Sequence, residues 1–492
     1  MAKVFLALCF LLLSFFAFTQ GSANLRKDSV TAPVSLKYKN PSLFKRFFLG
    51  KNYRTEWQTP VTFPIFRINT LGLKIEELGG GQQTKSLQMV DKQGRAWVLR
   101  TVDKDVEKAL PEFLRNTLAQ KVTQDMVSAA HPYAPLTIPT LAQAIGVIVP
   151  VPTFYYVPDD PALEPYRSIF ANTICMLEQR EPTPDRSETE NTEDMLEELL
   201  EENDHQVIQQ AVLRARLLDM IVADWDRHAD QWRWGKRDSG SVEYYYAIPR
   251  DRDQAYFYSN GLLVRLAKVI ALRHMVGFQD DLDQLKNLNH KSWEFDRMFL
   301  NQLDRRDWEL IIKSVQASLT DKVIQTAAGK LPPSIYSLSG PTIEKKLKGR
   351  RNELLTAGLK YYDYITRYPL ISGTEQEEYF KVSGNGDTLL VQVYDLTDDG
   401  KQGRKFFERT FREEETKYLT FQGYGGKDKI EVAEGTNSDI RLKLIGGEGA
   451  DEYTIRGNIK TDIYEEETDN NKISNGSRIK VRKDNTRTKS TK

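Results

Sequence analysis

Five polar side chains occur at two points of the sequence and are of the types that phosphoryl transfer requires. Asp226, His228 and Gln231 follow an apolar helical stretch, and Asp251 and Asp253 follow the next strand-like run. Because a helix–loop–strand–loop order brings both loops to one edge of a fold, we expect these side chains to meet. One carboxylate can orient an attacking hydroxyl group, and another, with an amide oxygen, can hold Mg²⁺ or Mn²⁺ on the phosphates.

A second group of residues, earlier in the chain, is suited to contact phosphates. Three glycines separate two strand-like runs, and glycine lets backbone N–H groups approach phosphate oxygens closely. Alone, three glycines more often form a plain hairpin, but here they precede the carboxylates in the order that a nucleotide site needs. The candidate nucleotide-binding residues are Gly79, Gly80, Gly81, Thr84, Lys85 and Arg100.

These motifs resemble those of atypical protein kinases. The segment Asp226-x-His228-x-x-Gln231 is similar to the Asp-x-His-x-x-Asn catalytic loop of the HipA toxin kinases. Its Asp-Arg-His triplet also resembles the loop of the secretory-pathway casein kinases. Residues 248–255, Ile-Pro-Arg-Asp-Arg-Asp-Gln-Ala, resemble the Ile-Pro-Trp-Asp-x-Asp element of the CotH spore-coat kinases.

The resemblance implies a two-lobed kinase-like domain that binds ATP or another nucleotide. Asp226 is then the catalytic carboxylate, with His228 beside it, and Asp251 or Asp253 holds the metal together with Gln231. Glu178 is expected near the nucleotide hinge, and Asp125 as the acidic partner of Arg100. Arg100 replaces the strand lysine of such kinases and differs from it in reach and geometry. The phosphate acceptor, a protein or a small molecule, stays unidentified.

The rest of the chain predicts an α+β protein with an added C-terminal domain. Strands are expected at 73–78, 86–90, 96–102, 147–157, 169–177 and 242–248, and helices at 114–130, 187–204, 209–223 and through most of 262–364. After Pro369, short alternating runs between Gly and Asp turns predict a small all-β, sandwich-like domain. The expected boundaries are 1–23 for a signal peptide, 24–69 for an extension, 70–364 for the kinase-like domain, 370–465 for the β-rich domain and 466–492 for a disordered basic tail.

One turn sequence occurs twice in the C-terminal region. Residues 425–430 and 446–453 resemble half-repeats of the calcium-binding β-roll, whose turn is Gly-Gly-x-Gly-x-Asp, and only the second fits it fully. Because two units are too few for a stacked roll, we expect Gly-Asp turns in a sandwich. Calcium binding by these turns stays open.

Composition excludes some classes of protein and indicates export. The chain has 492 residues, 40% of them hydrophobic, and equal numbers, 69 each, of basic and acidic residues. A globally basic nucleic-acid binder is therefore excluded. The five histidines form no HxH or HExxH pair, which disfavours a common zinc hydrolase. The apolar run from Val4 to Phe18, followed by Gly21-Ser22-Ala23, predicts a signal peptide cleaved near Ala23, and hence an exported bacterial protein, periplasmic, outer-membrane-associated or extracellular.

A second class of function is a non-catalytic, envelope-associated binding or structural module, a pseudokinase. Much of the chain is loosely similar to the region that accompanies calcineurin-like phosphoesterase domains in some bacterial secreted proteins. The chain lacks the Gly-Asn-His-Asp segment that a phosphoesterase itself needs, so such a module would work beside a phosphoesterase.

Overall fold

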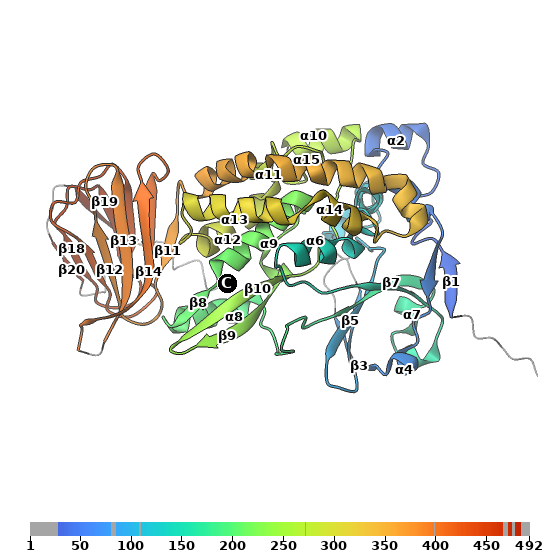
Figure 1. Cartoon of the computed structure of the whole chain (residues 1–492), viewed down its shortest axis with the longest axis horizontal. Coiled ribbons are helices and arrows are strands. Elements are labelled where there is room, and N and C mark those ends of the chain that lie inside the picture. Colours follow the sequence, from blue (N-terminus) through green and yellow to red (C-terminus); the bar gives the residue numbers. More distant parts are fainter. Residues whose placement is uncertain are drawn as a thin grey trace, which may run out of the picture.

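A computed structural model describes residues 28–79, 85–107, 110–270, 272–397, 399–465, 471–474 and 478–483. Helices and strands are both abundant, which confirms the α+β class, and a strand-rich region forms the C-terminal end (Figure 1). Within these ranges no helix is both long and apolar enough to cross a bilayer. The predicted signal peptide and most of the predicted tail lie outside the described residues.

The first described segment packs against the rest of the protein through a small sheet and short helices. Trp57 is buried, and its indole N–H donates to the carbonyl oxygen of Ala130 at 3.0 Å. This ties the segment to the chain around residue 130. The elements are β1 (Ser29–Ala32), α2 (Leu43–Leu49), α3 (Arg54–Gln58), β2 (Val61–Pro64), antiparallel to β1, and α4 (Ile68–Leu71).

An antiparallel five-stranded sheet follows, in the order β3-β4-β5-β7-β6. Leu87 and Met89 alternate with more exposed residues along β4 and are fully buried on one face, as the period of two along a strand requires. The register pairs Gly79 with Ser86 and Ser86 with Arg100, so the base of the glycine hairpin adjoins Arg100. The strands are β3 (Lys74–Gly79), β4 (Ser86–Val90), β5 (Ala96–Thr101), β6 (Thr153–Val157) and β7 (Thr173–Gln179), with helices α5 (Leu118–Met126), α6 (Ile138–Ala144) and α7 (Arg167–Phe170) among them.

A helical region packs beside this sheet and includes a small sheet of its own, ordered β8-β10-β9. Its central helix α9 (Gln209–Val222) is buried along most of its length. The other elements are α8 (Thr192–Glu201), β8 (His205–Val207), β9 (Trp232–Ser239), β10 (Val242–Pro249), α10 (Leu262–Ile270), α11 (Leu285–Leu288), α12 (Trp293–Phe299), α13 (Arg305–Ser318), α14 (Asp321–Ala328) and α15 (Pro333–Ile365).

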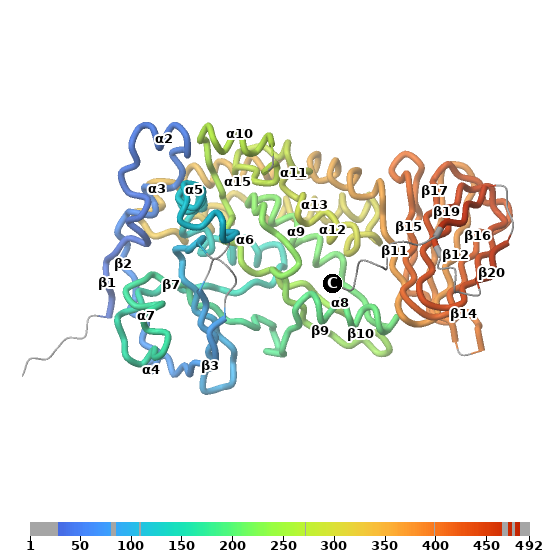
Figure 2. Tube along the Cα trace, turned by 180° about the vertical axis from the view of Figure 1, so that it is seen from behind, coloured from blue at the N-terminus to red at the C-terminus, as the bar shows by residue number. Residues whose placement is uncertain are grey.

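Helix α15 connects the helical region to the C-terminal sheets. Near its middle the buried Arg350 donates to the carbonyl oxygens of Met220 and Ile221, at 2.6 and 2.8 Å, and thereby satisfies the C-terminal end of α9. At its end the Tyr362 hydroxyl donates to Glu415 at 2.8 Å. The helix therefore contacts both α9 and the sheets (Figure 2).

Two sheets face each other in the C-terminal region, as expected for a sandwich, but most strands wind as a solenoid. From β15 onwards the strands alternate between the sheets and pair in parallel with the strand two positions later. The elements are β11 (Leu370–Ser372), β12 (Glu378–Ser383), β13 (Thr388–Leu396), β14 (Gln402–Arg412), β15 (Tyr418–Gln422), β16 (Lys429–Val432), β17 (Arg441–Ile445), β18 (Glu452–Ile455), β19 (Thr461–Glu465), β20 (Lys472–Ile473) and β21 (Ile479–Lys483).

The repeated Gly-Asp turns stack the coils of this solenoid. The Asp451 carboxylate accepts the N–H of Asp428 at 2.9 Å, the Asp428 carboxylate accepts the N–H of Glu378 at 2.9 Å, and the Asn471 side chain accepts the N–H of Asp451 at 2.6 Å. The ladder thus has members in four coils. The expectation that the turns are too few to stack was wrong, because the outer members of the ladder, Glu378 and Asn471, lack the Gly-Gly signature.

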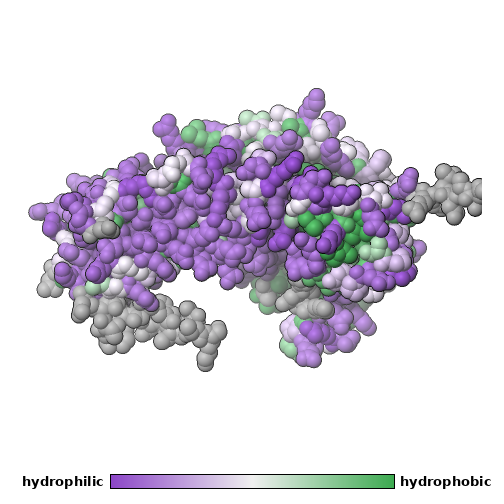
Figure 3. Space-filling model, turned by 90° about the horizontal axis from the view of Figure 1, so that it is seen from below, coloured by the Kyte–Doolittle hydropathy of each residue, from purple (hydrophilic) through white to green (hydrophobic). Residues whose placement is uncertain are grey.

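Surface polarity differs along the molecule. Seen from below, hydrophilic residues cover most of this face, and hydrophobic residues gather toward the end that carries the five-stranded sheet (Figure 3).

Candidate functional site

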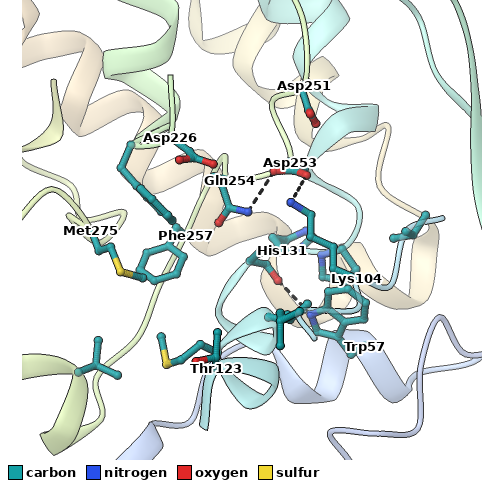
Figure 4. Close-up of a pocket in the computed structure, with 18 of the residues that line it drawn as sticks. Trp57, Lys104, Thr123, His131, Asp226, Asp251, Asp253, Gln254, Phe257 and Met275 are labelled. Carbon is teal, nitrogen blue, oxygen red and sulfur yellow. Dashed lines mark hydrogen bonds and ion pairs between the residues drawn. The ribbon is translucent and has the colours of Figure 1, made fainter. Parts of the chain in front are cut away.

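A cavity of about 710 Å³ lies between the five-stranded sheet and the helical region. Three carboxylates line it, those of Asp226, Asp251 and Asp253, together with Arg100 from the sheet (Figure 4). The structure therefore brings together four of the residues that the sequence singled out. A volume of this size is typical of small-molecule and cofactor sites.

The loop that carries Asp226 is fixed by the buried Arg227. Helix α9 ends where Ala223 adopts a left-handed conformation, with φ of 56°, which turns the chain toward the cavity. The Arg227 guanidinium donates to Asp219 and Asp224, each at 3.1 Å, and to the carbonyl oxygen of Arg250. Because Arg250 immediately precedes Asp251, this one side chain connects the two acidic loops.

The segment after β10 is not extended. Asp251 has φ of 56°, a conformation that costs about 1 to 3 kcal/mol and often occurs at functional sites. The neighbouring arginines do not neutralise the two carboxylates. Arg252 donates to Asp219 at 2.8 Å, and an Arg250 nitrogen lies 3.8 Å from Glu178. Asp251 and Asp253 are thus left directed at the cavity.

Each of these two carboxylates is paired with a cation from the sheet side. A guanidinium nitrogen of Arg100 lies 3.2 Å from Asp251, and the Lys104 ammonium pairs with Asp253. Burial tends to raise the pKa of Asp251, but Arg100 and Lys104 lower that pKa to about 2. Burial, with the nearby Asp251 charge, raises the pKa of Asp253 to about 6 despite the opposing effect of Lys104. Two neighbouring carboxyls thus differ in protonation behaviour, which is typical of functional sites.

Asp226 has a different cationic neighbour from the one that the sequence indicates. The basic residues next to it in the sequence are Arg227 and His228. Arg227 instead points into the protein, and His228 is partly exposed with its Nδ1 atom 3.6 Å from Asp230. The cation beside Asp226 is Lys291, whose Nζ lies 2.5 Å from Oδ1 and 5.1 Å from the ring of Trp225.

Asp125 and Glu178, two acidic residues expected near the nucleotide, do not line the cavity. Asp125 pairs with Arg54, at 2.8 Å between Oδ1 and Nη1, and with Lys45, so its expected pairing with Arg100 was wrong. The acidic residue beside Arg100 in β7 is Glu178, 3.6 Å away. Glu178 is only 3% exposed and does not line the large cavity, so it contacts Arg100 without reaching the cavity itself.

The remaining candidates do not line the cavity or fall outside the described residues. Gln231 is buried, does not line the cavity, and has an Oε1 atom that makes no hydrogen bond within the described part of the chain. Gly80, Gly81 and Thr84 fall outside the described residues. Gly79 ends β3, and the carbonyl oxygen of Lys85 accepts the N–H of Thr101 at 3.1 Å.

Sequence reasoning missed two lysines and an apolar wall. Lys104 follows Arg100 by four residues, so its place at the same end of the sheet was a usable signal, whereas Lys291 comes from a distant segment that no local pattern connects to Asp226. Opposite the charged groups, apolar side chains line the cavity, and Phe257 and Met275 lie near Asp226 (Figure 4). The others include Leu49, Val122, Met126, Leu263, Val264 and Leu272.

The solved structures to which this chain is loosely similar include two kinases. No protein-family model and no curated protein matches this sequence. The Helicobacter pylori proinflammatory kinase CtkA aligns over 56% of this chain and 93% of its own, with 9% identity and a TM-score of 0.30. The Chaetomium thermophilum Rio2 kinase, in a complex with ADP/Mg²⁺ and phosphoaspartate, aligns over 61% and 84%, with 12% identity and a TM-score of 0.24. Both TM-scores are below 0.5, so the interpretation of the site rests on the side chains described above.

Proposed function

We propose that the chain binds a nucleotide, ATP or a close relative, with Mg²⁺ or Mn²⁺, and transfers phosphate to a protein or small-molecule acceptor. The observation that carries the proposal is that three carboxylates from two loops line one cavity with two cations, Arg100 from strand β5 and Lys104 from the segment just after it. Asp226 orients the acceptor hydroxyl, Asp251 and Asp253 hold the metal, and Arg100 and Lys104 contact the phosphates. This is the division of roles in atypical kinases of the HipA and CotH kind.

The donor set suits a hard divalent cation. Carboxylate oxygens are the ligands that Mg²⁺ prefers, and two of them come from one short segment, Asp251 and Asp253. The metal would supply electrostatic stabilisation of the phosphates. Because Arg100 and Lys104 now pair with these carboxylates, both cations must turn toward the phosphates when metal binds. Gln231 would need to reorient before its free Oε1 atom could reach the same ion.

The shape of the cavity suits a nucleotide with its phosphates toward the sheet. Charged groups lie at the end formed by β5 and the two acidic loops, and the wall that includes Phe257, Val264 and Met275 is apolar. A planar base can pack against such a wall, while the polar groups fix its phosphates. We place the base there for this reason.

One observation favours a second function, nucleotide binding without transfer. Lys291, Arg100 and Lys104 already pair with Asp226, Asp251 and Asp253, so every acidic group in the cavity has a cation without any metal. A chain of this kind would act as an envelope-associated binding module. Export itself, with cleavage near Ala23, is part of the proposal in either form.

The proposal is tested by thermal unfolding of the chain with ATP or GTP, with and without Mn²⁺, followed by incorporation of label from γ-labelled nucleotide into envelope extracts. Nucleotide at about 100 times its Kd stabilises a protein by about 2.7 kcal/mol. Metal-dependent stabilisation with label transfer is the expected result. Stabilisation without transfer supports the binding module, and no response to either nucleotide rejects both forms. Mass spectrometry of the exported chain reads the cleavage site.

A further inference from the structure

Two adjacent short helices expose an unusual amount of apolar surface. In α10, whose sequence is LLVRLAKVI, only Val264 is buried, and in α2, LFKRFFL, only Leu49 is buried. Phe44 is 73% exposed and Ile270 is 81% exposed. The α2–α10 surface comprises Leu43, Phe44 and Phe47 with Leu262, Leu263, Leu266, Val269 and Ile270. Exposed apolar groups gathered in this way mark interaction sites.

The two helices form one rigid surface. The Asn260 side chain accepts the N–H of Lys51 at 2.9 Å, and the Ser259 hydroxyl donates to the carbonyl oxygen of Leu49 at 3.4 Å. A Cβ atom on Gly261 would lie 2.4 Å from the carbonyl carbon of Leu49, so only glycine permits this approach. Helices α2 and α10 accordingly lie side by side at the top edge of the molecule (Figure 1).

The two segments that form this surface contain charged residues of one sign only. No acidic residue occurs from 29 to 55 or from 254 to 279, whereas both segments contain several lysines and arginines. Lys45 pairs with Asp125, but within the described residues Arg46, Arg265 and Lys268 form no ion pair. Exposed Phe and Leu among unpaired basic residues are typical of helices that lie in the interface of an anionic membrane.

We propose that the α2–α10 surface binds the surface of an anionic lipid bilayer. Apolar side chains of both helices enter the region between headgroups and acyl chains, and the basic residues contact lipid phosphates. An anionic bilayer fits better than a second copy of this chain, because two copies would bring the same unpaired basic residues together. The inference does not depend on phosphate transfer.

The position of this surface gives the cavity a defined relation to the membrane. Leu49, at the end of α2, and Leu263, in α10, line the same cavity as Asp226. The helices that would contact lipid thus form part of the wall of the cavity.

The test is co-flotation of the isolated chain with vesicles of phosphatidylcholine alone, or mixed with phosphatidylglycerol. Mass spectrometry of the same sample establishes its first residue, because an uncleaved apolar run at Val4–Phe18 would itself bind lipid. The variants are Phe44→Asp with Ile270→Asp for the apolar face, Arg46→Gln with Arg265→Gln for the charge, and Leu310→Asp as matched control. Leu310 is 57% exposed on α13, outside the α2–α10 surface.

We expect binding to the anionic vesicles only, a loss of about tenfold or more in the apolar variant, and weaker, less salt-sensitive binding in the charge variant. The control should bind as the wild type does. The proposal is overturned if the wild type does not float with anionic vesicles, or if the apolar variant floats equally well. It is also overturned if the wild type forms dimers, the apolar variant does not, and neither of these two proteins binds lipid. Circular dichroism checks that each variant folds. If the double variant of the apolar face misfolds, Phe44→Ser or Ile270→Ser alone is tested in its place.

Discussion

The ammonium group of Lys291 lies 2.5 Å from a carboxylate oxygen of Asp226 and joins the end of helix α9 to a segment some sixty residues later. Asp226 therefore faces the cavity as half of an ion pair. In a phosphotransfer site the pair has two uses, since the carboxylate can accept the proton of the acceptor hydroxyl while the ammonium stabilises charge on the phosphate.

Replacement of Asp226 should separate binding from transfer. Asp226→Asn keeps the size of the side chain but removes the proton acceptor, so we expect turnover to fall about 100-fold or more while nucleotide affinity stays nearly constant. Steady-state kinetics and calorimetry measure the two effects. Asp230→Asn, four residues later on an exposed side chain, is the matched control. Equal turnover in Asp226→Asn and the wild type would remove Asp226 from the mechanism.

Metal binding should depend on pH through Asp253. Its pKa, raised to about 6 by burial, means that the carboxyl takes up a proton as pH falls below 6 and then cannot ligate a cation. We expect the affinity for Mn²⁺, in the presence of nucleotide, to fall by about tenfold per pH unit below that point.

Two variants distinguish the carboxyls in this titration. Asp253→Asn should bind Mn²⁺ weakly with little pH dependence. Asp251→Asn should also bind weakly but keep a pH dependence, shifted to lower pH because the Asp251 charge no longer raises the pKa of Asp253. Titrations monitored by Mn²⁺ electron paramagnetic resonance provide the affinities. If Asp253→Asn retains the wild-type pH profile, another group controls the binding.

The buried His131 should make the fold sensitive to acid. Burial lowers the pKa of His131 to about 3, and the neutral ring accepts the Tyr133 N–H at 3.2 Å and lies 3.0 Å from the Ser339 hydroxyl. Because the folded pKa is depressed, the contribution to stability is present above about 6.5, the unfolded pKa, and is lost as pH falls below it.

The loss amounts to about 1.4 kcal/mol in the free energy of unfolding between pH 7.5 and 5.5. Urea unfolding followed by tryptophan fluorescence measures it. His131→Gln should be less stable at neutral pH but should lack this part of the pH dependence. A variant whose stability declines with acid as steeply as that of the wild type would show that His131 is not the responsible group.

Two glycines of the solenoid offer a matched pair. Both have positive φ, 137° for Gly449 and 80° for Gly435, but a Cβ on Gly449 would lie 1.6 Å from the carbonyl oxygen of Gly426, whereas no atom lies within 4 Å of a Cβ on Gly435. Gly435→Ala should cost about 1 to 2 kcal/mol of backbone strain, and Gly449→Ala considerably more, because the coils must separate. Hydrogen exchange of β16 and β18 reports the difference, and equal protection in both variants would argue against close stacking.

Local patterns in the sequence predicted the elements that carry the carboxylates. Helix α9 and strand β10 begin at the expected residues because apolar periodicity and turn residues specify them locally. The helix–loop–strand–loop order along the chain also predicted that Asp226, Asp251 and Asp253 lie near one another. Their partners could not be predicted, because Lys291 and Lys104 reach them through tertiary packing.

The C-terminal fold was harder to predict for a similar reason. Solenoid stacking depends on hydrogen bonds between neighbouring coils. At one end of the ladder the Asn471 side chain accepts a backbone N–H as the Asp428 and Asp451 carboxylates do, whereas at the other end Glu378 contributes its backbone N–H. Because these side chains differ in type, the repeat is weak in the sequence although it is regular in the backbone.

Helix α15 has a mechanical consequence for the molecule. From Thr342 to Ile365 it contains no proline and extends about 36 Å. Arg350 donates a hydrogen bond to the end of α9, just before the Asp226 loop, and Tyr362 donates one to Glu415 in the C-terminal region. Because the helix is attached at both places, no hinge lies between them. A force on the C-terminal sheets, such as tension from an attached partner, would be transmitted along this helix to the loop that bears Asp226.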